Sequence, residues 1–148
     1  MVVKLQGIKV EVDKKLAGLK SEVASLKGVT AFYLFGSYAS GRATTLSDID
    51  LAYLPEENLE ADEIQALDKK LYLRLSRLFQ TDDLTLINLR DAPLALVYEI
   101  LQGKLIFCRN HEDLAAFKER ILALYPEIRR LQDQFFNTYA KKLKKRYG

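Results

Sequence analysis

The sequence predicts an α/β (α+β) fold in which a small mixed sheet is packed by helices. The run "VTAFYLF" (29–35) is rich in β-branched and aromatic residues and is apolar on both faces, which is typical of a central strand. Several other segments of the chain place apolar residues at helical spacing. The 49% apolar and 29% charged residues are those of an ordinary globular protein.

The first half of the chain predicts a helix followed by two strands. The helix ends at Gly28, and the strand 29–35 is broken by Gly36. A second strand is expected over 48–54, where Pro55 stops it. The apolar stripe of the helix follows a 4-3-4-3 spacing and consists of Val12, Leu16, Leu19, Val23 and Leu26.

The second half predicts two further strands, at 83–89 and 104–108, and four helices. Asn58 is expected to cap the first of these helices, and Pro93 to open a short one that reaches Gly103. Two helices are expected at the end, the last with Pro126 in its first turn. The predicted stripes are Ile64, Leu67, Leu71, Leu75 and Leu78; then Leu114, Phe117, Ile121 and Leu124; then Ile128, Leu131, Phe135, Tyr139 and Leu143.

Length and composition predict one domain over 1–148, and the last two predicted helices form a helical extension at 111–148. The single cysteine, Cys108, excludes an intrachain disulfide and suits a reducing compartment. Residues 1–15 contain no apolar run long enough for a signal peptide or membrane span, so we expect a cytoplasmic protein without a membrane partner.

The net charge of +3 comes from the end of the chain. The last ten residues, "YAKKLKKRYG", hold five Lys or Arg and no acid, whereas the remainder carries 18 basic and 20 acidic side chains. Cations suit the C-terminal end of a helix, and we therefore interpret the tail as a solvated helix end. Binding of nucleic acid through this tail is expected to be weak at most.

Two aspartates at the start of a buried strand need an explanation. Asp48 and Asp50 are two residues apart, so their side chains leave the strand on the same face. Like charges held this close destabilise each other unless a cation lies between them. Carboxylate oxygens are the ligands that Mg²⁺ prefers, together with water and substrate phosphates. The pair therefore predicts a magnesium site.

A phosphate-binding turn is predicted just upstream of the aspartates. Gly36 permits close approach of the backbone, and Ser37 can cap a short helix whose free amides face an anion. Arg42 adds a guanidinium that can bind phosphate with two donors. The stretch "GSYASGRA" also approaches the P-loop pattern, but Arg42 and Ala43 stand where that pattern requires lysine and a hydroxyl, so we reject a P-loop.

The stretch "GSYASGRATTLSDIDLAYL" (36–54) resembles the signature of the DNA polymerase β-like nucleotidyltransferases, in which Gly-Ser is followed by Asp-x-Asp. Within this superfamily, the short chain is similar to the minimal nucleotidyltransferases (MNT). The resemblance extends over about 8–108, which implies that this part is the core of the domain. The resemblance implies a polymerase β-like fold, ATP as nucleotide donor, Mg²⁺, and a third carboxylate on a later strand. Asp83 in "TDDLTLINL" matches that third position, and Asp82 is the alternative because strand parity is open.

The resemblance also implies a reaction and a partner. Asp48, Asp50 and Asp83 would hold Mg²⁺ and carry catalysis, while Gly36, Ser37 and Arg42 would bind the phosphates of ATP. Many MNT proteins are antitoxins that add AMP to a tyrosine of a HEPN ribonuclease toxin, which implies a hetero-oligomer with that toxin here. Two alternatives are an antitoxin that acts by binding alone and a nucleotidyltransferase acting on a small molecule.

Overall fold

The computed structural model describes residues 14–36 and 48–147, and the side chains of 135, 136 and 139–147 are not described. Four strands form one sheet in the order β3-β2-β1-β4. The strands are β1 (Val29–Phe35), β2 (Ile49–Pro55), β3 (Leu84–Asn88) and β4 (Lys104–Cys108). The order confirms that the run 29–35 is a central strand, since β1 lies between β2 and β4.

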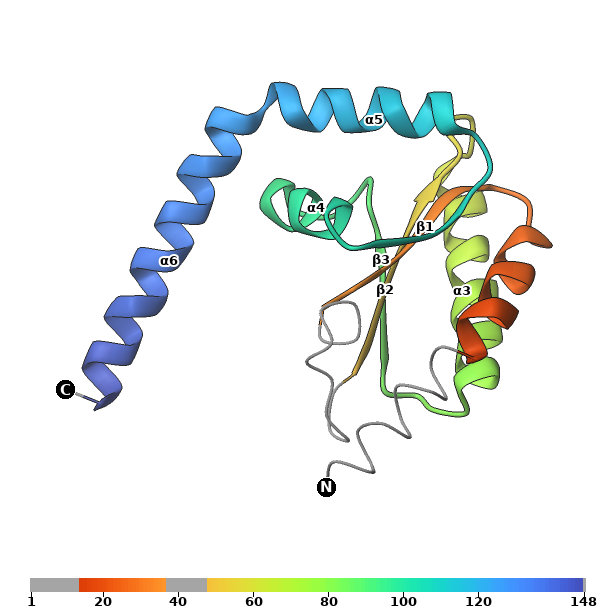
Figure 1. Ribbon diagram of the computed structural model, residues 1–148, viewed down its shortest axis with the longest axis horizontal. Coiled ribbons are helices and arrows are strands. Elements are labelled where there is room, and N and C mark those ends of the chain that lie inside the picture. The colour runs from red at the N-terminus through yellow and green to blue at the C-terminus, as the bar shows by residue number, and fades with distance from the viewer. Residues whose placement is uncertain (1–13, 37–47, 148) are drawn as a thin grey trace.

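Helices cover both faces of this sheet (Figure 1). A helix over 14–24 and α3 (Ala61–Phe79) lie on one face. The other face is covered by α4 (Leu94–Leu101), α5 (His111–Ala123) and the start of α6 (Tyr125–Tyr147). The rest of α6 extends away from the sheet, as Figure 1 shows. The mixed α/β fold predicted from the sequence is thereby confirmed.

Strand direction brings four strand ends together. β1 pairs with β2 and with β4 in antiparallel fashion, whereas β2 and β3 are parallel and are joined by the crossover helix α3. The starts of β2, β3 and β4 therefore lie at the same end of the sheet as the end of β1. This end carries the residues that the sequence singled out for chemistry.

Side chains that alternate along the strands form two hydrophobic cores, one on each face of the sheet. Phe32 and Leu34 of β1 and Leu51 of β2 face the helix 14–24 and α3, while Tyr33 and Ala52 face α4 and α5. All five side chains are 2% exposed or less, as expected for strands with helices on both faces.

Two local predictions were wrong, and a third held in part. Asn58 does not cap α3, because it lies in a turn closed by the Leu59 N–H to the Glu56 carbonyl (3.3 Å), and the helix begins after Glu60. Leu78 packs against the core as its place in the predicted stripe requires, but it is only partly buried, whereas the next residue, Phe79, is buried. Leu124 is 48% exposed because α5 ends at Ala123, so Leu124 no longer follows the helical stripe.

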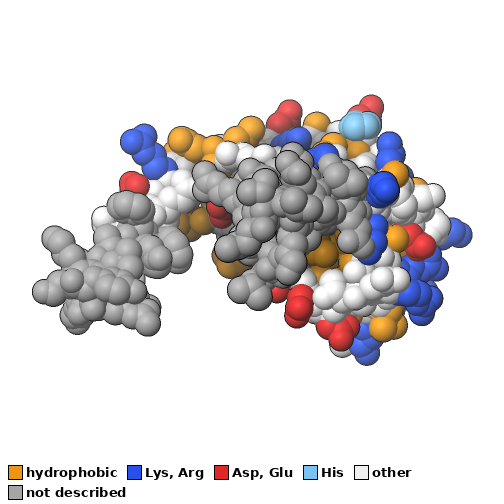
Figure 2. All heavy atoms as spheres, turned by 60° about the horizontal axis from the view of Figure 1, so that its bottom comes forward, with side chains coloured by type: hydrophobic (Ala, Val, Ile, Leu, Met, Phe, Trp, Pro, Cys, Tyr) orange, Lys and Arg blue, Asp and Glu red, His pale blue; other side chains and the backbone are white. Residues whose placement is uncertain are grey.

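Charge is unevenly spread over the surface. Figure 2 shows Lys and Arg side chains along the edge of the molecule formed by the helix 14–24 and α3. The exposed basic side chains of the helix 14–24 and α3 are Lys14, Lys20, Lys69, Lys70, Arg74 and Arg77.

In the described part of the chain, no helix is both long and apolar enough to span a membrane.

Two buried tyrosines in adjacent strands differ in hydrogen bonding. Tyr53 is fully buried and its hydroxyl donates to Oδ1 of Asp68 in α3 at 2.8 Å. Tyr33 is 1% exposed, and its hydroxyl has no hydrogen-bond partner within the described residues. An unsatisfied buried hydroxyl costs free energy, whereas a hydrogen bond to a carboxylate stabilises the fold.

Replacing each tyrosine by phenylalanine should therefore have opposite effects. Tyr53→Phe should lower the free energy of unfolding by about 1.5–3 kcal/mol, the usual contribution of a hydrogen bond to a charged group. Tyr33→Phe should leave it unchanged or raise it by about 1 kcal/mol, because it removes only the unsatisfied hydroxyl. Urea unfolding followed by circular dichroism measures both, and an equal loss in the two variants would contradict this assignment.

Tyr33 should also make the stability of the protein sensitive to alkali. Burial, and secondarily the charge of Cys108, raise the pKa of Tyr33 from 10.0 to about 12. Tyr33 therefore ionises more easily in the unfolded protein than in the folded one. Its contribution to the free energy of unfolding is fully present below pH 10 and is lost as the pH rises toward 12. The stability difference between Tyr33→Phe and the wild type should grow over this range.

Candidate active site

The two aspartates lie where the chain enters β2. Asp48 directly precedes the strand and is exposed, whereas Asp50 is half-buried. Ile49 between them points to the opposite face, where it is 6% exposed in the core beneath α3. Asp48 and Asp50 therefore share the face that carries Ala52, as strand alternation predicts.

The register of β3 places Asp83 beside this pair. Ile49 pairs with Leu84, and the Ile49 N–H donates to the Asp83 carbonyl at 3.1 Å. Leu84 is buried on the same face as Ile49, so Asp83 falls on the face of Asp48 and Asp50. Asp82 has the opposite parity. The geometry favours Asp83 as the third carboxylate, and its catalytic role stays a prediction.

Gly36 completes the site from the end of β1. Its φ of +71° lies in the left-handed region, and a Cβ atom built on it would be 2.2 Å from Oδ2 of Asp50. Only glycine leaves room for the Asp50 carboxylate to lie against the backbone. The predicted close approach at Gly36 is present, with a carboxylate of the protein itself as the neighbouring group.

The environment of Asp50 disfavours its charge. Burial, and next the nearby charge of Asp48, raise its pKa above the ordinary aspartate value, while the hydroxyl of Thr85 acts in the opposite direction. A bound cation would remove the cost that burial and repulsion impose on the ionised pair. The donor set consists of carboxylate oxygens, which suits Mg²⁺. The residues present therefore fit the metal that the sequence implied.

Part of the predicted phosphate-binding set cannot be placed. Ser37 and Arg42 lie outside the described residues. The described members of the predicted site, Gly36, Asp48, Asp50 and Asp83, are brought together at one end of the sheet. Sequence reasoning did not single out Thr85, which pairs with Asp50. Its position two residues after Asp83 on a strand could have indicated that it lies on the same face as Asp83.

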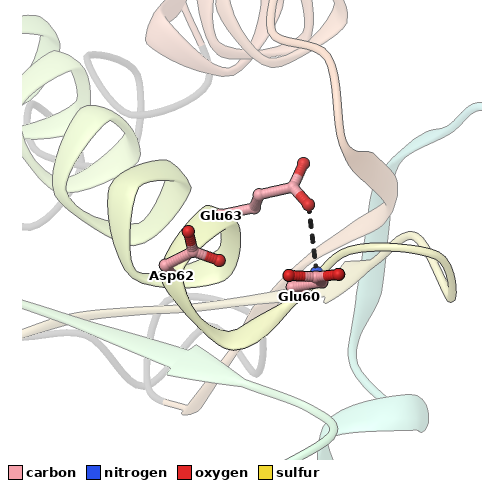
Figure 3. Close-up of side chains that lie close together, drawn as sticks. All are labelled: Glu60, Asp62 and Glu63. Carbon is pink, nitrogen blue, oxygen red and sulfur yellow. Dashed lines mark hydrogen bonds between the residues drawn. The ribbon is translucent and has the colours of Figure 1, made fainter.

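A second group of carboxylates lies elsewhere. Within the described residues, Glu60, Asp62 and Glu63 place one oxygen each within 4.8 Å of one another, and all three side chains are exposed (Figure 3). They form the start of α3, where the Glu60 N–H donates to Glu63 at 3.3 Å in a capping box. Acidic side chains are favoured at a helix N-terminus, which accounts for the group without a metal. Because α3 follows the end of β2, this group lies at the opposite end of the sheet from Asp48.

A family model described as "Polymerase beta, Nucleotidyltransferase" matches residues 18–112, well over half of the chain. The chain belongs to this nucleotidyltransferase family. A curated relative, "Protein adenylyltransferase MntA" of Shewanella oneidensis, is 30% identical over 115 residues, which are 74% of this chain and 78% of that protein. The resemblance to nucleotidyltransferases seen in residues 36–54 is thus confirmed.

Solved structures share the fold. A toxin–antitoxin crystal structure with AMP-PNP matches 89% of this chain and 98% of the other, with a TM-score of 0.59 and 22% identity. A complex of the tri-AMPylated HEPN toxin of Shewanella oneidensis with its MNT antitoxin matches 86% of this chain and 98% of the other, with a TM-score of 0.59 and 20% identity. The polymerase β-like nucleotidyltransferase fold is thereby established for this family member.

The electrostatics of Asp50 lead to a stability prediction. Asp50→Asn should raise the melting temperature of the metal-free protein, because the amide keeps the shape of the side chain and lacks the charge that burial and Asp48 disfavour. Because Asp50 is only half-buried, solvent screens part of this effect, and we expect a gain of at most roughly 2–4 °C. Thermal unfolding in the presence of a chelator measures this change.

The control is Asp82→Asn, which alters an exposed carboxylate of the opposite parity and should give no gain. Because the pKa of Asp50 is raised, the advantage of Asp50→Asn should shrink as the pH falls and Asp50 becomes neutral. A melting temperature below that of the wild type would contradict the electrostatic account.

Proposed function

We propose that this chain is a Mg²⁺-dependent protein adenylyltransferase that transfers AMP from ATP to a tyrosine hydroxyl of a HEPN ribonuclease toxin and thereby acts as its antitoxin in the cytoplasm. The observation that carries the proposal is the relative named protein adenylyltransferase, matched over 74% of this chain. The shared end of the sheet with Gly36, Asp48 and Asp50 supports it, because it combines a close backbone approach with two carboxylates on one face.

Each described residue has a role in this proposal. Asp48 and Asp50 would hold Mg²⁺, and Asp83 would join them on the same face. Gly36 keeps the space that the Asp50 carboxylate occupies, so that this carboxylate is held in position before the nucleotide binds. Ser37 and Arg42 remain the predicted contacts to the phosphates of ATP.

The reaction would be an in-line attack of the tyrosine oxygen on the α-phosphorus of ATP, with pyrophosphate as the leaving group. When bound, Mg²⁺ supplies charge neutralisation on the phosphates and lowers the pKa of the attacking hydroxyl. The chain contributes by positioning carboxylates on rigid strands, since Asp50 belongs to a strand with neighbours on both sides.

The test is AMP transfer to the toxin. The protein, ATP and Mg²⁺ are incubated with a HEPN protein from the same genome, and intact-mass and peptide spectra are recorded. We expect the partner to gain one or more AMP groups on tyrosine and to lose ribonuclease activity only when ATP is present. Neutralisation without ATP and without an adduct would establish an antitoxin that acts by binding alone. Transfer to a small-molecule hydroxyl with an unmodified toxin would establish the other alternative.

A further inference from the structure

The Asp50 carboxylate lies between two neighbouring strands that differ in what they offer it. On the β1 side, Asp50 pairs with Phe35, and the adjacent Gly36 leaves open the space in which Oδ2 lies. On the β3 side, Asp50 pairs directly with Thr85. One neighbour thus provides room and the other provides a hydroxyl.

The pairing brings the Thr85 hydroxyl to the carboxylate. Paired residues of adjacent parallel strands leave the sheet on the same face, about 4.8 Å apart. Thr85 is half-buried, as Asp50 is, and the proximity of its hydroxyl lowers the pKa of Asp50, as a hydrogen-bond donor to a carboxylate does.

We propose that Thr85 is a positioning residue, whose hydroxyl fixes the orientation of the Asp50 carboxylate so that this carboxylate and Asp48 face the same cation. The inference rests on the proposed metal-dependent function. Thr85 touches neither the nucleotide nor the acceptor in this proposal, and it acts only through Asp50. Partners that orient metal ligands commonly contribute tenfold or more to metal affinity.

A purely structural role for Thr85 makes different predictions. A β-branched residue suits a strand, and valine would serve that role as well as threonine. Thr85→Val keeps the shape and removes the hydroxyl, while Thr85→Ser keeps the hydroxyl and removes the methyl group. The positioning role therefore predicts a defect in the valine variant alone, whereas a packing role predicts the reverse.

The experiment measures Mg²⁺·ATP binding by the full chain without any partner, by isothermal titration calorimetry and by the rise in melting temperature. Thr85→Val should weaken binding about tenfold, and Thr85→Ser should stay within about threefold of the wild type. Thr138→Val, at an exposed position of α6, is the matched control and should bind as the wild type does. Wild-type affinity in Thr85→Val, or a defect in Thr85→Ser as large as that in Thr85→Val, would overturn the proposal.

A second readout tests whether Thr85 acts through Asp50. In metal-free protein, Thr85→Val should lower the melting temperature by about 2–4 °C, because Asp50 loses a hydrogen-bond partner. In an Asp50→Ala background the same substitution should change it little, and an equal change in both backgrounds would overturn the proposal. Mg²⁺·ATP binding is measured without the toxin, whereas AMP transfer is measured with it. Hydroxyl-dependent binding together with a failure of transfer in the toxin assay would refute the proposed function and leave this inference standing.

Discussion

Asp48→Ala is expected to abolish AMP transfer, with a loss of about a thousandfold or more in rate. Asp48 is exposed at the start of β2, and in the proposed function its removal leaves Asp50 without the carboxylate that would share the cation. A thousandfold loss corresponds to about 4 kcal/mol of transition-state stabilisation, a reasonable contribution for a metal ligand. Single-turnover transfer of radiolabelled AMP to the toxin measures it.

The same assay decides the third carboxylate. Asp83→Asn should bind ATP and fail to transfer AMP, whereas Asp82→Asn should transfer at close to the wild-type rate. The register supports this expectation, since Ile49 pairs with Leu84 and Asp83 is thereby placed on the face of Asp48. An inactive Asp82→Asn beside an active Asp83→Asn would show that the chain before β3 is displaced in the working enzyme.

Gly36→Ala should reduce transfer about a hundredfold. The new methyl group would meet Oδ2 of Asp50 at 2.2 Å, and φ of +71° is unfavourable for alanine. The Asp50 carboxylate must therefore shift, and a displacement of about 1 Å in a reacting geometry can cost a hundredfold in rate. Transfer and Mg²⁺·ATP affinity should fall together in this variant.

Gly18→Ala is the matched control for this substitution. Gly18 lies in the helix 14–24, and a Cβ there would be 3.6 Å from Cδ1 of Leu78, an ordinary contact. Alanine in a helix interior should raise the free energy of unfolding by about 0.5–1 kcal/mol and leave transfer unchanged. Full activity in Gly36→Ala would show that the Asp50 carboxylate can occupy another position.

Much of the fold was readable from the sequence because local signals agreed with the tertiary structure. The strands at 29–35 and 104–108 match β1 and β4 at both ends, since glycine flanks the first on both sides and Gly103 and Arg109 flank the second. Predictions failed where two local signals competed. Asn58 and Glu60 both suit a helix N-terminus, and the turn at Glu56–Leu59 decided in favour of Glu60.

Candidate members of the site could be chosen from the sequence, whereas their arrangement could not. Asp48 and Asp50 follow from strand spacing alone, and Gly36 from its place after a strand. The choice between Asp83 and Asp82 needed the register with β2, which depends on a pairing between distant segments. The contact of the Asp50 carboxylate with Gly36 and the pairing with Thr85 arise from the same tertiary pairings, so no single segment encodes them.

The parallel pairing of β2 with β3 has a consequence for how the enzyme is made on the ribosome. β1 and β2 are neighbours in the chain and can pair once residue 55 has emerged, which assembles Gly36, Asp48 and Asp50. Asp83 and Thr85 can join only after the crossover through α3 has been synthesised and has docked. A nascent chain that stops within α3 thus carries a site that lacks β3. Full nucleotidyl transfer should appear only after β3 has been added, late in translation.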